Sequence, residues 1–265
     1  MFRGGRIPLT LIEQHALTSI KVNNVFIPAN ALKERVHKFA EPALFHTEGM
    51  NEYHLSKSGT ATKLRVGNRF FALLCNHQMT LSGEEFGYDQ FCLFGKKRQR
   101  LVSSERSVFV YDSVEKREDF DAILFEFTNS VQKQLVPKHD WFCVKPEQET
   151  QRLPSPLLVV GSGFPGETSS FLWPEGKRAE FNYTPFNIWG KQSKPDISGR
   201  LAFTPEHDLE IEPSGMSGGP VFGITQNGNE FELFWAGIIT EASKKKIHFL
   251  SATRLKRFFN LSLEN

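Results

Sequence analysis

Hydrophobic residues in this chain occur in short runs separated by turn residues rather than in long helical stretches. This pattern is typical of a β-barrel or β-sandwich rather than of alternating strands and helices. The clearest strand candidates are residues 62–66, 70–74, 107–111, 122–127, 157–160, 221–225, 231–239 and 247–250. Asn227-Gly228 lies between two of these runs and predicts a tight hairpin.

Helical periodicity is confined to two segments. Residues 30–40 place three apolar side chains on one helical face, and Pro42 is expected to end that helix. Residues 253–261 form the second candidate, which is expected to pack against the C-terminal half of the fold. The sequence therefore predicts an all-β protein with little helix.

Composition and charge exclude several classes of partner. The chain has 25 Phe against four Trp and four Tyr, and rings without a polar group are expected inside the fold. A net charge of +2 over 265 residues gives no field that favours nucleic acid or a membrane surface. Two basic runs, 96–100 and 244–246, lack interleaved aromatic residues and are interpreted as solvated hairpin tips. No apolar stretch is long enough to span a bilayer.

The three cysteines point to a reducing compartment. Cys75, Cys92 and Cys143 form an odd set without metal-site spacing, whereas small secreted proteins usually pair their cysteines. No apolar segment of a signal peptide follows the basic residues at the N-terminus. We therefore expect a cytoplasmic protein with reduced thiols and no metal.

The most informative motif is Gly-Met-Ser-Gly-Gly-Pro at residues 215–220, which puts Ser217 on a glycine-rich turn. A match to its five fixed positions arises by chance with a probability on the order of 10⁻⁶. A serine hydroxyl needs a neighbouring base before it attacks a carbonyl carbon, and backbone N–H groups must stabilise the resulting oxyanion. The motif therefore indicates acyl transfer.

Two upstream residues supply the rest of that chemistry. His77 follows the apolar run 70–74, and histidine accepts and returns protons near neutral pH. Asp121 precedes a second apolar run, and an aspartate beside a histidine fixes the tautomer of the imidazole.

The order His77, Asp121, Ser217 resembles that of the chymotrypsin-fold serine proteases. Within that superfamily, the chain is most similar to the HtrA/Deg-like bacterial branch. Four short matches carry this likeness: Ser-Gly-Thr at 58–60, Gly-Phe-Pro at 163–165, Ala-Gly-Ile-Ile-Thr at 236–240 and Phe-Leu-Ser-Ala at 249–252. Many HtrA-type chains continue into a PDZ module, and this one is expected to be a protease unit without it.

The resemblance implies two antiparallel six-stranded β-barrels with a C-terminal helix. Residues 1–50 are then an N-terminal extension containing a short helix, 51–136 the first barrel lobe and 137–265 the second. The extension is expected to pack on the barrels, to cover the cleft or to dock a partner.

The resemblance also implies a set of site residues. His77, Asp121 and Ser217 are the expected catalytic residues, and the backbone N–H groups of Gly215 and Ser217 the expected oxyanion hole. Asp119 lies two residues before Asp121 on the same strand face and is the alternative acid. Asp121 is preferred because the family pattern is Asp, a small residue and then aliphatic residues.

Substrate preference follows less directly. By the resemblance, Ile211 lies at the base of the first specificity pocket and Ile239 also contacts substrate, which favours apolar side chains before the scissile bond. A one-residue shift would bring in Glu210 or Glu212 and favour Lys or Arg instead.

Met216 changes the expected route of activation. Digestive relatives carry an acidic residue at this position, which pairs with a newly cut N-terminus. Methionine carries no charge, so the site is expected to be preformed or to be set by a regulatory protein partner.

The sequence therefore predicts a serine endopeptidase that cleaves protein or peptide substrates without a cofactor. The alternative is a catalytically inactive relative that binds or regulates another protein. A competing Gly-x-Gly-x-x-Gly pattern at 161–166 is interpreted as a β-turn, because Pro165 prevents the helix that a dinucleotide site requires.

Overall fold

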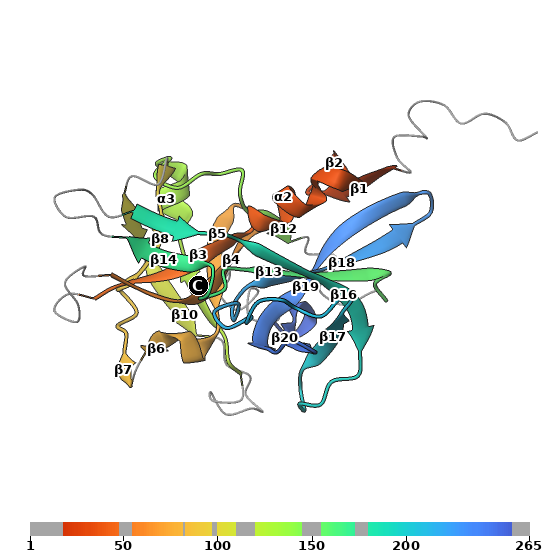
Figure 1. Ribbon diagram of the computed structural model, residues 1–265. Coiled ribbons are helices and arrows are strands. Elements are labelled where there is room, and N and C mark those ends of the chain that lie inside the picture. Colours follow the sequence, from red (N-terminus) through yellow and green to blue (C-terminus); the bar gives the residue numbers. More distant parts are fainter. Residues whose placement is uncertain are drawn as a thin grey trace, which may run out of the picture.

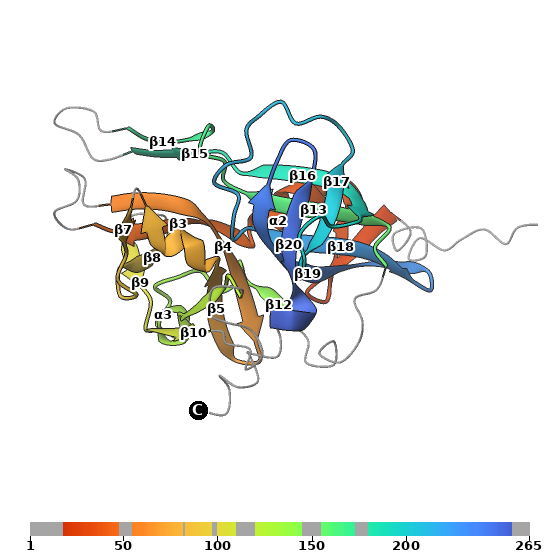
Figure 2. The ribbon, with the colours of Figure 1, turned by 90° about the horizontal axis from the view of Figure 1, so that it is seen from below.

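The computed structural model describes residues 18–47, 55–81, 83–96, 100–109, 120–144, 155–172 and 180–255. Most of the ordered elements are strands, which form two large sheets lying side by side (Figures 1 and 2). The predicted all-β class with two barrel-like units is confirmed.

The first sheet carries the predicted histidine and aspartate. It contains β3 (Ala40–His46), β4 (Leu55–Val66), β5 (Arg69–Leu74), β8 (Phe91–Phe94), β9 (Leu101–Ser103), β10 (Arg106–Phe109), β11 (Ile123–Glu126) and β12 (Phe142–Val144). Their order is β10-β11-β5-β4-β3-β8-β9, with β12 beside β4. Within the described ranges this sheet is a half-barrel. The pairing of β12 with β4 is parallel, unlike the antiparallel pairing expected throughout.

The second sheet carries the predicted nucleophile. It contains β1 (Ser19–Val22), β2 (Val25–Pro28), β13 (Leu158–Gly163), β16 (Phe186–Ser193), β17 (Leu201–Pro205), β18 (Pro220–Asn227), β19 (Glu230–Ala242) and β20 (Ile247–Ser251). The order β18-β13-β16-β17-β20-β19, with a further pairing between β18 and β19, closes six strands into a barrel. β1 pairs with β19 in parallel and β2 extends it outward.

Short elements complete the fold. Two small hairpins consist of β6 (Thr80–Leu81) with β7 (Glu84–Glu85), and β14 (Ser169–Leu172) with β15 (Glu180–Tyr183). The helices are η1 (Ala29–Ala31), α2 (Leu32–His37), η2 (Asn76–Met79) and α3 (Thr128–Gln132). A helical turn begins at residue 252, and residues 256–265 lie outside the described ranges.

The helix predicted over residues 30–40 is shorter than expected, and Pro42 does not end it. The α-helix ends at His37, and the chain enters β3 at Ala40. Pro42 lies inside this strand, where the pairing of β3 with β4 shifts register between Pro42 and Leu44. A proline is tolerated at such an irregularity because its missing N–H breaks no regular ladder bond.

The hairpin predicted at Asn227-Gly228 is present. Asn227 pairs with Glu230 at the ends of β18 and β19, and Gly228 in the turn has a φ of +60°. Glycine adopts this left-handed conformation at little cost, which explains the turn signal in the sequence.

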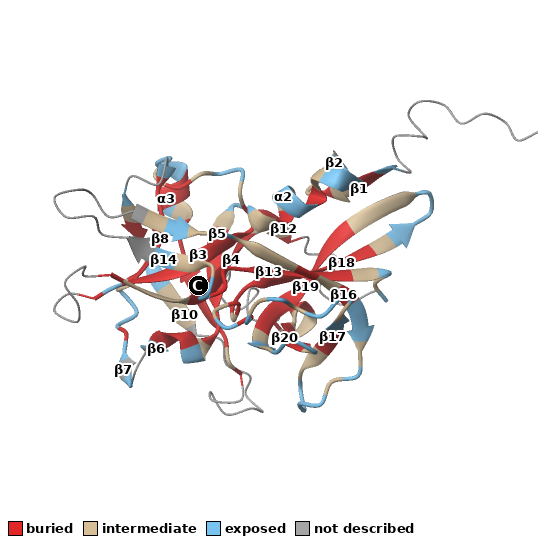
Figure 3. Ribbon diagram, in the orientation of Figure 1, coloured by how far each residue is buried: buried red, intermediate tan, exposed pale blue. Residues whose placement is uncertain are grey.

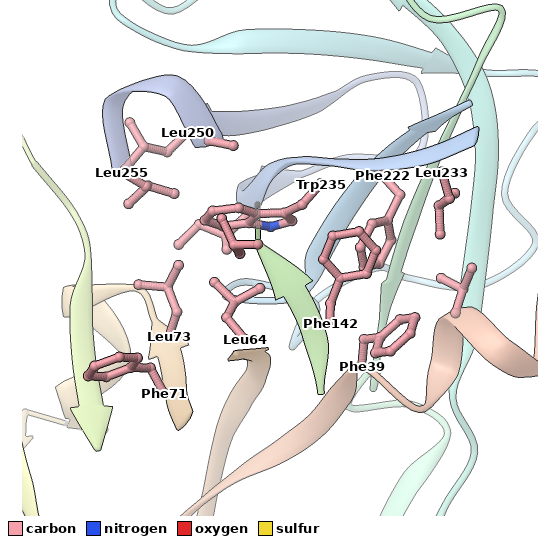
Figure 4. Close-up of a cluster of buried hydrophobic side chains, with 14 of the residues drawn as sticks. Phe39, Leu64, Phe71, Leu73, Phe142, Phe222, Leu233, Trp235, Leu250 and Leu255 are labelled. Atoms are coloured by element: carbon pink, nitrogen blue, oxygen red, sulfur yellow. The ribbon is translucent and has the colours of Figure 1, made fainter. Parts of the chain in front are cut away.

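A shared hydrophobic core joins the two sheets (Figure 4). Phe39, Phe142 and Phe222 pack together at its centre, with ring centroids 4.9 to 5.6 Å apart. Leu64 and Leu73 of the first sheet meet this core together with residues of the second. Figure 3 shows buried residues gathered along the central strands and exposed ones at the hairpin tips. The expectation that phenylalanines lie inside is confirmed for these rings.

The described part of the N-terminal segment belongs to this core. Ile20 and Val22 of β1 and Leu32 and Val36 of α2 are all buried in it. Of the three expected roles for the extension, packing against the barrels applies to residues 19–37, whereas β3 within the expected extension is itself a strand of the first sheet.

The three cysteines are free thiols, and Cys75 and Cys92 are buried. Among the helices in the described ranges, none has both the length and the hydropathy needed to cross a bilayer.

Candidate active site

His77 and Asp121 are held together by two hydrogen bonds. The backbone N–H of His77 donates to Oδ1 of Asp121 at 2.9 Å, and ring Nδ1 lies 2.7 Å from Oδ2. The carboxylate accepts, so Nδ1 carries the proton and Nε2 remains free to act as a base. This meeting follows from strand pairing, because His77 lies three residues after β5, Asp121 lies two residues before β11 and the two strands are neighbours. Asp119 lies outside the described residues.

Ser217 directly follows a turn that requires glycine. The N–H of Met216 donates to the carbonyl of Pro213 at 3.1 Å, and Gly215 between them has a φ of +91°. A four-residue turn with a positive φ only at its third residue is type II, which favours glycine there. Gly218 also has a positive φ, and a Cβ at this position would collide with the carbonyl of Thr60. Gly215 and Gly218 of the motif are therefore required by the backbone.

The serine turn is anchored to both sheets. Thr60 of β4 donates its N–H to the carbonyl of Ser217 at 2.9 Å. On the other side, the N–H of Gly218 donates to the carbonyl of Ile239 at 2.7 Å, and the N–H of Ile239 donates to the carbonyl of Gly219 at 2.8 Å. These bonds place Ser217 at the junction of the two sheets.

The expected oxyanion hole has two free donors. Among the described residues, the N–H groups of Gly215 and Ser217 donate to no acceptor. The peptide between Ser214 and Gly215 is fixed by the N–H of Gly166, which donates to the carbonyl of Ser214 at 2.7 Å. A trans peptide points its C=O and N–H in opposite directions, so this contact directs the Gly215 N–H away from Gly166.

A second contact joins the loop after β13, which contains Gly166, to the loop that precedes Ser217. Oε2 of Glu167 accepts a hydrogen bond from the backbone N–H of Glu212 at 2.8 Å. Met216 lies within this loop and is fully buried among the apolar residues that fill the second barrel. Apolar packing of Met216 thus stabilises the loop that precedes Ser217.

The hydroxyl of Ser217 points toward β19 rather than toward His77. Oγ donates to the carbonyl of Thr240 at 3.4 Å, and within the described residues no hydrogen bond joins Ser217 to His77. A serine side chain moves between staggered positions by rotation about one bond. Catalytic hydrogen bonds are also often long before substrate binds, so the observed position is compatible with catalysis.

Ser217 and His77 line one cavity of about 460 Å³. Its other lining residues are Lys57, Ser58, Gly59, Gln78, Thr80, Gly166, Ser169, Ser214 and Gly215. The structure thus brings the predicted base, the predicted nucleophile and both residues of the expected oxyanion hole to a common space.

The two predicted specificity residues do not line this cavity. The side chain of Ile239 is fully buried in the interior of the second barrel, and only its backbone contacts the serine turn. Ile211 is partly exposed. Their roles in substrate binding stay predictions.

Cys75 also lies near His77 and Asp121, and the three possible ligand atoms are within 4.8 Å of one another. Burial raises the pKa of the Cys75 thiol well above its usual value, and the charge of Asp121 raises it further. A thiol must lose its proton to bind a metal or to act as a nucleophile. This environment therefore disfavours both roles.

Thr60 is a site residue whose role the sequence did not reveal. Its buried hydroxyl donates to the carbonyl of Gly215 at 2.9 Å and accepts from the N–H of Phe164 at 3.0 Å. One side chain thus connects β4 to Gly215 of the serine turn and to the segment after β13. The Ser-Gly-Thr match at 58–60 was the only signal for it.

Gln78 was likewise missed. Its side chain accepts from the N–H of Cys75 at 2.6 Å and donates to the carbonyls of Ser58 at 2.6 Å and Thr60 at 3.0 Å. It therefore fixes the turn that bears His77 against β4.

No family model matches this sequence, and no curated protein matches it. The structure is similar to that of human heparin binding protein, with a TM-score of 0.53 and 9% identity over 87% of this chain and 93% of that chain. A double mutant of the human protein gives a TM-score of 0.54 and 10% identity over the same shares of the two chains. At this level of identity the likeness establishes the fold alone, and that fold is the chymotrypsin fold.

Proposed function

We propose that this protein is a serine endopeptidase in which Ser217 is the nucleophile, His77 the general base and Asp121 the residue that orients it. The observation that carries the proposal is the pair of hydrogen bonds from His77 to Asp121, in a cavity that also contains Ser217. The sequence resemblance to the HtrA/Deg-like branch supports the same assignment.

In the proposed reaction, Nε2 of His77 takes the hydroxyl proton of Ser217 as Oγ attacks the substrate carbonyl carbon. The carbonyl oxygen becomes an oxyanion and accepts hydrogen bonds from the N–H groups of Gly215 and Ser217. The imidazolium then gives its proton to the leaving amine as the C–N bond breaks. Water repeats the sequence on the acyl-enzyme and releases the acid.

The oxyanion donors require little rearrangement. Because the contact between Gly166 and Ser214 already fixes the Gly215 peptide, this backbone donor needs no rearrangement before charge develops on the substrate. This supports activity in the isolated chain over a site that a partner must assemble. If the protein has a regulatory partner, we propose that this partner restrains the enzyme rather than activates it.

The second candidate function is binding without catalysis. The hydrogen bond from Ser217 to Thr240, in place of one to His77, favours it, and the similar solved structures are named for heparin binding. Under this alternative the cavity holds a protein segment that is never cut.

A fluorophosphonate probe separates the two candidates, because it reacts only with an activated serine. We expect the isolated wild-type protein to be labelled on Ser217, as located by peptide mass spectrometry. Labelling is expected to disappear in Ser217→Ala and His77→Ala and to persist in Ser58→Ala, which removes another hydroxyl from the same cavity. No labelling of the wild type at neutral or mildly alkaline pH would contradict the proposal.

Casein cleavage gives the matching functional readout. Wild type and Ser58→Ala are expected to release peptides at similar rates, and Ser217→Ala is expected to release none. Equal release by wild type and Ser217→Ala would mean that a contaminating protease does the cutting.

A further inference from the structure

A lysine from the first sheet reaches into the cavity that contains Ser217. Lys57 lies near the start of β4, lines the cavity and donates a hydrogen bond from Nζ to the carbonyl of Phe164 at 2.6 Å. A Cβ built on Gly215 would lie 3.5 Å from this Nζ. The ammonium group is therefore next to Gly215 of the serine turn.

The charge of Lys57 has no carboxylate partner among the described residues, where none of the ion pairs includes it. Burial lowers its pKa to about 8. The buried Lys63, by contrast, is paired with Glu41 at 2.8 Å. Lys57 is only partly exposed, and withdrawing an ammonium from water without a nearby anion is unfavourable, so the environment of Lys57 lacks an anion.

The position of Lys57 assigns it to one side of the scissile bond. In the proposed reaction the leaving amine takes its proton from His77, so the substrate beyond the scissile bond passes the first-sheet residues around His77. Among these, Lys57 lies on β4 and lines the cavity, whereas Thr240, toward which Ser217 points, lies on β19 of the other sheet. Lys57 therefore faces the leaving group.

We infer that Lys57 selects substrates that carry Asp or Glu at the first or second position after the scissile bond. This inference rests on the proposed endopeptidase function and adds the substrate class. An ammonium has three donors, of which the Phe164 carbonyl occupies one. The remaining donors form charge-assisted hydrogen bonds with a carboxylate, which supplies the missing anion.

Cut-site profiling tests this assignment. A peptide pool of diverse sequence is digested with each variant, and the residues on both sides of every cut are counted by mass spectrometry. For the wild type we expect Asp and Glu to be enriched about tenfold over Asn and Gln at these two positions, as for one charge-assisted hydrogen bond. The enrichment is expected to vanish in Lys57→Met and Lys57→Gln, and to change to Lys and Arg in Lys57→Glu.

The matched control is Lys133→Met, which removes an exposed lysine outside the cavity and is expected to keep the wild-type profile. Thermal unfolding of each variant shows whether it folds. If the neutral variants do not fold, Lys57→Arg, which retains a positive charge, is profiled beside Lys57→Glu in their place. An unenriched wild type, or the same enrichment in wild type and Lys57→Met, overturns the inference.

Failure of the two proposals gives different results. If the fluorophosphonate labels Ser217 but the profile does not depend on Lys57, the endopeptidase function stands and the role of Lys57 is wrong.

If neither labelling nor cleavage occurs, the endopeptidase function is wrong, and Lys57 is then tested by binding alone. A fluorescein-labelled peptide of alternating Gly and Glu is expected to bind wild type about tenfold more tightly than Lys57→Met. Its Gly and Gln counterpart is expected to show no difference, and equal binding of the acidic peptide overturns the inference.

Discussion

The backbone N–H of Gly166 donates to the carbonyl of Ser214 at 2.7 Å, and this contact sets the direction of the next N–H along the chain. Gly166 follows β13, whereas Ser214 precedes the serine turn, so the contact joins two loops that are distant in sequence. With the Ser214 carbonyl held in this way, the Gly215 N–H is left as a free donor. The proposed oxyanion hole thus depends on contacts within the chain.

Removal of the Gly166 donor tests this relationship. Gly166→Pro lacks the N–H and is expected to lower kcat/KM about 10²-fold, because a misplaced oxyanion donor costs nearly as much as a missing one. Gly166→Ala retains the N–H, and its Cβ would meet only the Ser214 carbonyl, at 3.7 Å, so its activity is expected to stay near wild type. Comparable fluorophosphonate labelling rates for the two variants would show that the contact is dispensable.

Thr60 offers a side-chain test of the same turn. Thr60→Val removes the hydroxyl bonded to Gly215 and Phe164 while preserving the shape, which leaves one buried and one partly buried backbone group unpaired. Loss of such a partner costs about 1–3 kcal/mol, so we expect a lower midpoint in urea unfolding and slower labelling of Ser217. Thr60→Ser keeps the hydroxyl and is the matched control. A normal midpoint for Thr60→Val would contradict this account.

Replacement of the orienting carboxylate tests the catalytic assignment. In Asp121→Asn the side chain no longer presents two acceptors to His77, so the wrong imidazole tautomer is favoured. We expect kcat to fall about 10⁴-fold with little change in folding, as in other enzymes with this arrangement. Asp208→Asn, at an exposed position, is the control and is expected to leave kcat unchanged. Near-normal turnover of Asp121→Asn would exclude the triad.

The proximity of His77 and Asp121 could be predicted because each lies at the end of an apolar run, and apolar runs of this kind become paired strands. The glycines of the serine turn were predictable for a similar reason, since their conformations are required locally. Lys57, Thr60 and Gly166 were not predictable as site residues, because their roles depend on contacts across more than 40 positions of sequence. No local pattern records such contacts.

The parallel pairings were missed for a physical reason as well. The expected strand runs indicated antiparallel neighbours joined by turns. However, β1 pairs with β19, and β12 pairs with β4, without a hairpin turn between the paired strands. A short strand that joins the edge or the middle of a sheet from a distant segment carries no turn signal.

An ion cluster in the first sheet predicts loss of stability in acid. Glu126 on β11 accepts from Arg69 on β5 and Arg106 on β10, each at 2.7 Å. Burial acts to raise the pKa of Glu126, but the hydrogen bonds from Arg69, Thr128 and Arg106 outweigh it and lower the pKa from 4.5 to about 2. A depressed carboxyl pKa stabilises the fold above the unfolded value, and this stabilisation is lost as pH falls from about 4.5 to about 2.

Urea unfolding of wild type and Glu126→Gln measures this contribution. At neutral pH we expect the variant to be less stable by about 1–2 kcal/mol, which allows for solvent screening at the exposed Arg106 partner. The difference is expected to shrink as pH falls toward about 2, because the wild-type carboxyl then also becomes neutral. A difference that stays constant with pH would place the effect of Glu126 in packing rather than in charge.

The lowered pKa of Lys57 gives its proposed role a pH signature. Below a pH of about 8 the side chain is cationic, and above it the side chain is neutral, whereas an exposed lysine stays charged to about 10.5. The ratio of kcat/KM for a peptide with Glu after the scissile bond to that for its Gln counterpart is therefore expected to fall toward one as pH rises past about 8. His77 is the other titratable cavity residue, and its protonation affects both peptides alike and cancels in the ratio. Lys57→Arg keeps its charge throughout this range and is therefore expected to keep a constant ratio. A wild-type ratio that does not change with pH would show that the ammonium of Lys57 does not bind the substrate carboxylate.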